Sequence, residues 1–247
     1  MRRIRIVLAY DGTDYHGWQT QPGIATIQGE IEAVVSEIEG SAVDVHGSGR
    51  TDAGVHALAQ VAAFSIANPI PCPNLKRAMN RLLPPAIRVL ETAEASSGFH
   101  PRFDARSKTY EYRIFRGEVC SPFERRFVLH HPYPLDSAAM ARAAVLFSGE
   151  HDFSAFAASD ERDALGHSKV RSVTSSVILS EGDRLIYRIA GSGFLKHMVR
   201  HIVGTLMEVG KGNLDEHTVR HLLTAPPGEK AIHAVPARGL FLVRVEY

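Results

Sequence analysis

The order of strand and helix patterns along the chain limits its fold more than any other feature of the sequence. Alternating apolar residues predict strands, and apolar residues spaced by three and four predict helices. The elements expected in the first half are a strand over 3–10, a helix over 26–39, strands over 43–45 and 58–66, a helix over 75–82 and a strand over 87–90. Thr26 is the expected N-cap of the first helix and Gly40 its stop. The first half therefore has the order βαββαβ.

The second half is expected to repeat this order, although the residues themselves do not visibly repeat. Its expected elements are a strand over 109–115, a helix over 136–147, strands over 172–179 and 185–190, helices over 195–209 and 216–223, and a strand over 240–245. We expect an α+β fold of two tandem ferredoxin-like halves, 1–103 and 104–247, sharing a mainly antiparallel sheet with helices on one face. The glycine-rich segment between the strands expected over 43–45 and 58–66 lies in the first half.

Composition and length exclude several classes of protein. The 247 residues are 45% hydrophobic and 22% charged, which is ordinary for a globular protein with a substantial core. No apolar run approaches the roughly 18 residues that span a bilayer, so we expect no membrane contact. Two cysteines without a CxxC spacing, and an N-terminus that lacks a signal-peptide pattern, lead us to expect a cytoplasmic protein.

Charge is balanced in total but uneven along the chain. There are 28 basic and 27 acidic residues, a net charge of +1. Between Pro101 and Tyr133 there are seven Arg or Lys residues and four acidic residues. Arg suits bidentate recognition of phosphate. The stretch is compatible with a nucleic-acid partner, but on this feature alone the base composition of the genome is the favoured explanation of the many arginines.

The most concentrated chemical signal is the segment from Gly47 to His56, which reads GSGRTDAGVH. Its three glycines allow close backbone approach to a ligand, and loops that carry one reactive carboxylate are common catalytic sites. Asp52 has no second acidic residue nearby in sequence. A single carboxylate of this kind points to nucleophilic catalysis or to ion pairing. A long hairpin turn is the alternative interpretation.

Two further segments offer partners for that loop. On the helix expected over 195–209, Lys196 and Arg200 flank an apolar stripe, so either could pair with Asp52 or lie on the solvated surface. On the strand expected over 109–115, Tyr110 and Tyr112 share one face. They could stack on unpaired bases or pack in the core.

Two histidine pairs at i, i+4 spacing raise a metal hypothesis. His197 and His201 form one pair, and His217 and His221 form the other. Neither pair has the Glu of an HExxH motif. We therefore expect no metal site and favour helix-surface positions for both pairs.

Seven motifs, spread nearly end to end, resemble the tRNA pseudouridine synthase A family. They are YDGTDYHGWQ, IQGEIE, GSGRTDAGVHALAQ, FHPRFDARSKTYEYRI, HDFSAF, GSGFLKHMVRHIVG and GLFLVRVEY. The GRTDAGVHA block is highly specific. The resemblance implies an isomerase that converts uridine to pseudouridine at positions 38, 39 and 40 of the tRNA anticodon stem-loop, with a catalytic cleft between two related halves.

Residue roles follow from that resemblance. It makes Asp52 the catalytic aspartate, Arg200 its ion-pair partner, Tyr110 the ring against the target uracil and Arg50 the residue at the entrance during base flipping. His197 departs from the aromatic residue expected at its position, which puts a role for Lys196 or His197 in doubt.

The implied reaction involves neither redox change nor energy input, so we expect no cofactor and no metal. Asp52 could attack C1′, remove the 2′ proton or add to C6 of the base. The resemblance also implies a homodimer in which one tRNA contacts both subunits. We expect phosphate contacts from the region between Arg102 and Arg126, and binding that weakens steeply with salt.

Two other functions remain open from the residues alone. The first is a non-catalytic RNA-binding protein built from two modules of the RNA-recognition (RRM-like) layout, in which Asp52 is only a turn residue. The second is a metal-assisted hydrolase that uses the histidine pairs and loses activity on chelation.

Overall fold

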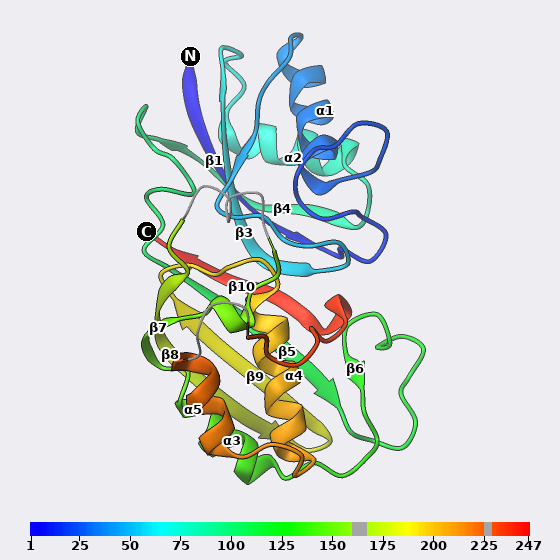
Figure 1. The fold of residues 1–247 in the computed structure, drawn as a ribbon. Coiled ribbons are helices and arrows are strands. Elements are labelled where there is room, and N and C mark those ends of the chain that lie inside the picture. Colours follow the sequence, from blue (N-terminus) through cyan, green and yellow to red (C-terminus); the bar gives the residue numbers. More distant parts are fainter. Residues whose placement is uncertain (160–166, 225–228) are drawn as a thin grey trace. The chain divides into compact units, whose positions relative to one another are not determined.

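The computed structural model describes residues 1–159, 167–224 and 229–247. Within them the chain forms two compact units (Figure 1). Unit 1 comprises residues 1–106 and 241–247, and unit 2 comprises residues 107–240. Each unit has its own strands, helices and buried core, and each is described separately.

Unit 1 contains the expected order of strands and helices up to β4, and the last strand of the chain, expected in the second half, also belongs to unit 1. Its elements are β1 (Arg2–Tyr10), α1 (Ile27–Glu39), β2 (His46–Gly47), β3 (His56–Ile66), α2 (Cys72–Leu82), β4 (Ile87–Ala95) and β10 (Leu240–Glu246). β1 lies between β4 and β3, and both pairings are antiparallel. β2 pairs antiparallel with β3, and β10 pairs parallel with it at Phe241 and Leu242.

The core of unit 1 follows the predicted periodicities. Every second residue of β1, from Ile4 to Tyr10, is buried, and α1 buries the residues at three- and four-residue spacing. The Thr26 Oγ1 atom accepts a hydrogen bond from the Gly29 N–H group at 3.2 Å, which confirms the N-cap. Gly40 ends the helix with φ 79°, a left-handed conformation that favours glycine. Helices α1 and α2 contact each other and so cover the same face of the sheet.

The prediction of a strand over 43–45 is wrong. Val43 and Val45 are buried, but the strand here is only His46–Gly47. The N–H group of Val43 donates to the Ser36 Oγ atom at 2.9 Å, and that of Val45 donates to a Glu32 carboxylate oxygen at 3.2 Å. Side chains of α1 therefore take the hydrogen bonds that a neighbouring strand would have made.

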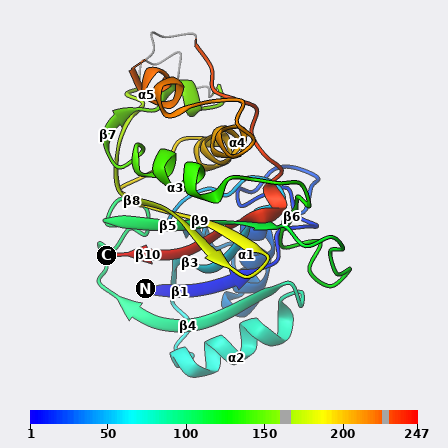
Figure 2. The same ribbon diagram turned by 90° about the horizontal axis from the view of Figure 1, so that it is seen from below.

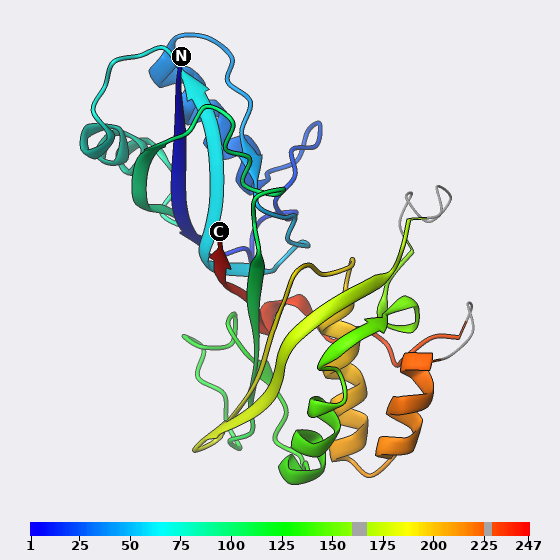
Figure 3. The same ribbon diagram turned by 90° about the vertical axis from the view of Figure 1, so that its left-hand side faces the viewer.

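The strands of unit 2 pair mainly antiparallel. Its elements are β5 (Ser107–Phe115), β6 (Leu129–His130), α3 (Ser137–Val145), β7 (Gly149–Asp152), the 3₁₀ turn η1 (Ser154–Phe156), β8 (Val170–Glu181), β9 (Arg184–Gly191), α4 (Met198–Gly210), α5 (Glu216–Thr224) and the 3₁₀ turn η3 (Ala237–Gly239). β9 lies between β5 and β8, and β7 extends the sheet beyond β8. Helices α3, α4 and α5 lie on one side of these strands (Figures 2 and 3).

Three details of unit 2 differ from the sequence-based expectation. The short strands β6 and β7 were not expected, because two to four residues carry no readable alternation. Helix α4 begins at Met198 rather than at residue 195. His197, directly before it, has φ 60°, so the chain enters the helix through a left-handed residue that apolar spacing cannot reveal.

The two units together have the expected class of structure. Strands pair mainly antiparallel, and the helices of each unit lie on one face of its sheet, which confirms the α+β prediction. No helix in the described ranges is long and apolar enough to cross a membrane.

Candidate active site

The glycine-rich loop of unit 1 is closely packed at its glycines. A Cβ atom on Gly47 would lie 2.5 Å from the Trp18 ring, so no larger residue fits there without displacing the indole. Gly54 has φ 75°, a conformation that other residues rarely adopt. Gly47 and Gly54 are therefore required by the shape of the loop.

A layer of buried polar side chains holds the loop from behind, and we call it the brace: Tyr10, Ser48, Thr51 and Gln60. The Ser48 hydroxyl donates to the Gln60 Oε1 atom at 2.6 Å, and the Gln60 amide nitrogen donates to the Gly49 carbonyl at 3.0 Å. The Tyr10 hydroxyl and the Thr51 Oγ1 atom are 2.9 Å apart. Because these groups bond one another inside the core, the loop is held in one conformation.

Burial gives the brace its electrostatic character. The Tyr10 ring is 4% exposed, and burial raises the pKa of its phenol to about 12, against a smaller lowering by the hydrogen bonds of Thr51 and Gln60. The phenol therefore stays protonated at neutral pH. It is a fixed hydrogen-bonding group rather than a proton-transfer group.

Asp52 lies at the turn of this loop, and its neighbours fix the main chain on both sides. The Val55 N–H group donates to the Asp52 carbonyl at 3.1 Å, and the Trp18 N–H group donates to the Thr51 carbonyl at 3.0 Å. The Asp52 side chain is half-buried, and the Arg50 side chain is exposed. A carboxylate on a braced turn, accessible to solvent, is suited to reach a reacting atom.

His56 supports the same region, and its position explains a residue that the sequence left without a role. Its ring is 1% exposed and stacks on Phe241, with ring centres 4.7 Å apart. The His56 Nδ1 atom accepts a hydrogen bond from the Gly12 N–H group at 3.1 Å and lies 3.2 Å from an Asp11 carboxylate oxygen. His56 thus ties β3 to the turn that follows β1.

In unit 2, Tyr110 and Tyr112 take different environments on β5. The Tyr110 ring is 8% exposed and meets Phe194 edge to face, with centres 5.0 Å apart. The Tyr112 ring is fully buried, and its hydroxyl donates to the Pro236 carbonyl at 2.8 Å. Tyr112 is therefore a core residue, whereas Tyr110 keeps 8% of its surface accessible.

Arg200 lies on the first turn of α4, at the position where the sequence expected a cation. Its Nε atom donates to the Val235 carbonyl at 2.7 Å, which fixes the guanidinium against the chain that precedes η3. Burial raises the pKa of the Tyr112 phenol, and the positive charges of Arg200 and Arg238 oppose that rise. Arg238 is a second cation of this region that the sequence did not single out.

The candidate residues divide between the two units. Asp52 and Arg50 belong to the braced loop of unit 1, while Tyr110 and Arg200 belong to unit 2. Lys196, the other candidate cation, is exposed in the segment that precedes α4. The ion pair between Asp52 and Arg200 stays a prediction.

The histidine pairs have other contacts. The rings of His197 and His201 are 6.4 Å apart, and the His201 Nδ1 atom lies 2.8 Å from the Ile232 carbonyl. The His221 Nε2 atom lies 3.1 Å from a Glu229 carboxylate oxygen. Over 1–159, 167–224 and 229–247, no group of three or more His, Cys, Asp or Glu residues is arranged to hold a metal ion.

The expected basic stretch is split by the fold. Arg102 and Arg106 belong to unit 1, and the other basic residues up to Arg126 belong to unit 2. In unit 2, Arg113 lies 3.2 Å from the buried carboxylate of Glu111. The sequence could not separate such paired residues from exposed ones.

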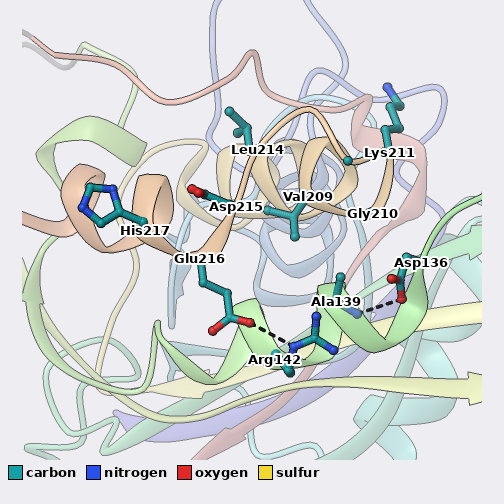
Figure 4. Close-up of a pocket in the computed structure, with 11 residues that line it drawn as sticks. Asp136, Ala139, Arg142, Val209, Gly210, Lys211, Leu214, Asp215, Glu216 and His217 are labelled. Carbon is teal, nitrogen blue, oxygen red and sulfur yellow. Dashed lines mark hydrogen bonds and ion pairs between the residues drawn. The ribbon is translucent and has the colours of Figure 1, made fainter.

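A pocket of unit 2 holds none of the predicted site residues. It has a volume of about 580 Å³ and lies between α3 and the segment joining α4 to α5 (Figure 4). Its charged groups already have partners. The Arg142 Nε atom donates to the Glu216 carboxylate at 2.9 Å, Asp136 caps α3, and Asp215 accepts from the Thr218 N–H group. These contacts stabilise the ends of helices.

Several residues that build the site were missed from the sequence. Gln60 and Tyr10 lie on strands whose pattern predicted only core positions, and Trp18 lies in a segment read as a loop. Polar residues at buried strand positions were the available signal, because such groups need hydrogen-bond partners.

Comparison with known proteins places the chain in a family. The model for tRNA pseudouridine synthase matches residues 6–104 and 143–247. A protein of Solibacter usitatus, named tRNA pseudouridine synthase A, is 64% identical over 247 residues, which is 100% of both chains. Proteins of the same name from Brevibacillus brevis and Pelobacter propionicus are each 43% identical, again over 100% of both chains. The chain therefore belongs to the tRNA pseudouridine synthase family and is an isomerase.

Proposed function

We propose that this protein converts uridine to pseudouridine at positions 38, 39 and 40 of the tRNA anticodon stem-loop, with Asp52 as the catalytic carboxylate. The observation that carries the proposal is the braced loop. It presents one carboxylate, half-buried and held on both sides by main-chain hydrogen bonds. Membership of the family supports tRNA as the substrate.

The reaction breaks the bond between N1 of uracil and C1′ of the ribose and forms a bond between C5 and C1′. The proton on C5 is lost, and N1 takes up a proton, so atoms and charges balance without an oxidant or an energy source. Asp52 would attack C1′, remove the 2′ proton or add to C6. All three routes need an ionised carboxylate close to the sugar or the base.

Arg200 is proposed to pair with Asp52 during the reaction. A guanidinium beside a carboxylate favours the ionised form, which is the reactive one. Its Nε atom is already bonded to the Val235 carbonyl, so its remaining N–H donors would face the carboxylate in a fixed orientation.

Tyr110 and Arg50 are proposed to act on the flipped nucleotide. Extruding a base from its stack costs a few kcal/mol, which contacts to the free base and its phosphates must offset. Tyr110 offers a ring edge fixed against Phe194, and Arg50 offers an exposed guanidinium two residues before Asp52.

The protein is further proposed to act as a cytoplasmic homodimer, with one tRNA contacting both subunits. Arg102 to Arg126 would then supply phosphate contacts, and log affinity would fall linearly with log salt concentration. A flat salt dependence would contradict that assignment, and a monomer by light scattering would contradict the dimer.

The test uses an unmodified tRNA transcript that carries 5-tritiated uridine in the anticodon stem-loop, with no metal or nucleotide added. Tritium leaves when C5 becomes the glycosidic carbon. The wild type is expected to release tritium and to leave pseudouridine at positions 38 to 40, mapped in the recovered RNA. Asp52→Ala is expected to release none.

The alternative of a non-catalytic RNA-binding protein makes the opposite prediction. Tight tRNA binding by both the wild type and Asp52→Ala, with no tritium released by either, would favour that alternative and overturn the proposed function.

A further inference from the structure

Unit 1 carries a groove that the proposed chemistry does not use. It is lined by Arg5, Arg106, Arg244, Val245, Glu246 and Tyr247 and has a volume of about 510 Å³. Arg5 lies on β1, Arg106 directly precedes β5 and Arg244 lies on β10. Residues separated by more than a hundred positions therefore place three guanidinium groups around one hollow.

Hydrogen bonds fix the frame of this groove. The Tyr247 hydroxyl donates to the Pro101 carbonyl at 2.8 Å, and its ring lies 5.1 Å from the Phe99 ring. The Arg106 N–H group donates to the Glu246 carbonyl at 2.8 Å. Burial raises the pKa of the Tyr247 phenol, so this donor keeps its proton at neutral pH. The groove is a built feature of unit 1.

Positive charge in the groove exceeds the negative charge of its side chains. The Arg244 Nε atom forms an ion pair with a Glu246 carboxylate oxygen at 3.1 Å, and both side chains are exposed. In the part of the chain that the structure describes, neither Arg5 nor Arg106 has a carboxylate within ion-pair distance. Guanidinium groups held without an acidic partner are suited to bidentate contacts with phosphate.

The turn beside the groove adds an exposed aromatic ring. Phe103, two residues after the Pro101 anchor, is 75% exposed, and the Arg102 guanidinium lies 5.7 Å from the centre of its ring. The Phe103 ring also contacts His100, with ring centres 4.3 Å apart. An exposed ring beside several cations is typical of surfaces that bind nucleic acid, because bases stack on the ring while cations bind the backbone.

We propose that Arg5 and Arg244 join Arg106, which belongs to the Arg102 to Arg126 region already proposed to contact phosphate, in a docking site for the phosphate backbone of the substrate tRNA, separate from the braced loop. The proposal rests on the proposed function for the identity of the RNA. The groove would contribute to affinity without taking part in bond breaking, so its loss would raise KM and leave kcat unchanged at saturating tRNA.

The experiment compares the wild type, a variant carrying Arg5→Gln, Arg106→Gln and Arg244→Gln, and the control Arg81→Gln. Arg81 is an exposed arginine on α2 of the same unit, outside the groove. Binding of unmodified tRNA is measured at several salt concentrations, and tritium release is measured at limiting and saturating tRNA. The three single variants guard against a folding defect in the triple variant, and melting curves check each protein.

The triple variant is expected to lower the slope of log affinity against log salt by about 2, given roughly 0.7–0.9 for each lost phosphate contact. Its KM should rise at least tenfold while kcat stays within twofold of the wild type. Each single variant should lower the slope by less than one, and Arg81→Gln should leave it unchanged.

A triple variant that folds and matches Arg81→Gln in slope and KM would overturn the groove proposal and leave the proposed function standing. Loss of kcat in the triple variant would also overturn it, because it would place these residues in the chemistry. If the wild type bound tRNA without releasing tritium, the proposed function would fail, and the salt slopes would still decide the groove.

Discussion

The two units hold their candidate site residues by different means. In unit 1, buried polar side chains of the brace bond one another and the loop that carries Asp52. In unit 2, Tyr110 contacts another aromatic ring, and Arg200 bonds a main-chain carbonyl. A main-chain carbonyl stays in place when a neighbouring side chain is replaced. By contrast, few residues could replace a side chain of the brace and keep its hydrogen bonds. The loop of unit 1 should therefore respond more strongly to a single substitution.

The largest effect is expected where the loop has no space. Gly47→Ala places a Cβ atom 2.5 Å from the Trp18 ring, so the indole or the loop must move. Overpacking of this kind lowers the free energy of unfolding by about 3 kcal/mol. Urea denaturation checks this value, with Gly98→Ala as control because a Cβ there meets nothing within 4 Å. Equal stability of the two variants would show that the loop is loosely packed.

The next effect tests the brace itself. Gln60→Leu removes the hydrogen bonds that Gln60 makes with the buried Ser48 hydroxyl and with the part-buried Gly49 carbonyl. Loss of these hydrogen bonds should lower the free energy of unfolding by about 2 kcal/mol, and a looser loop should lower kcat by roughly tenfold. Gln60→Asn keeps an amide donor and acceptor without adding a buried charge and should recover part of the stability. A change in KM alone would mean that the brace does not position Asp52.

A smaller effect is expected from the matching change in unit 2. Tyr112→Phe removes one hydrogen bond to the Pro236 carbonyl, and the ring stays in place. We expect a loss of about 1 kcal/mol in the free energy of unfolding and tritium release within threefold of the wild type. Thermal and urea denaturation measure the first, and the tritium assay measures the second. A loss of activity as large as that of Gln60→Leu would remove the difference between the units.

The smallest effect concerns pH. Burial lowers the pKa of His100, whose Nδ1 atom accepts hydrogen bonds from the N–H groups of Arg102 and Phe103. A histidine whose pKa is lower in the folded state loses stability as pH falls below its unfolded pKa of about 6.5. The free energy of unfolding should therefore decrease between pH 7 and pH 5. His100→Asn should show a weaker decrease, and an identical slope in both proteins would contradict this assignment.

The elements that could be predicted from sequence are those whose signal is local. The cap at Thr26, the stop at Gly40 and the alternation of β1 depend on neighbouring residues, and all three are confirmed. The strand expected over 43–45 failed because side chains of α1, distant in sequence, bond its amides. The start of α4 was predicted wrongly because the chain enters the helix through His197, whose left-handed conformation leaves no apolar pattern in the sequence.

The candidate site likewise has a part that could be predicted from the sequence and a part that could not. The glycines around Asp52 form a continuous motif, so the loop was found from sequence alone. The brace joins Tyr10 to residues 41 and 50 positions further on, and the groove joins Arg5 to Arg244. Contacts across such separations arise from strand pairing, which a single sequence does not encode locally.

The central claim is that the braced loop exists to present the Asp52 carboxylate to the reacting nucleotide. Asp52→Asn tests it most directly, because the amide keeps the shape of the side chain and removes its charge. Tritium release is measured in a single turnover with enzyme in excess, together with tRNA affinity and melting temperature. The account predicts affinity within threefold of the wild type, an unchanged melting temperature and a rate lowered by at least about 10⁴-fold, the scale on which loss of a catalytic nucleophile acts. A rate within tenfold of the wild type would contradict it.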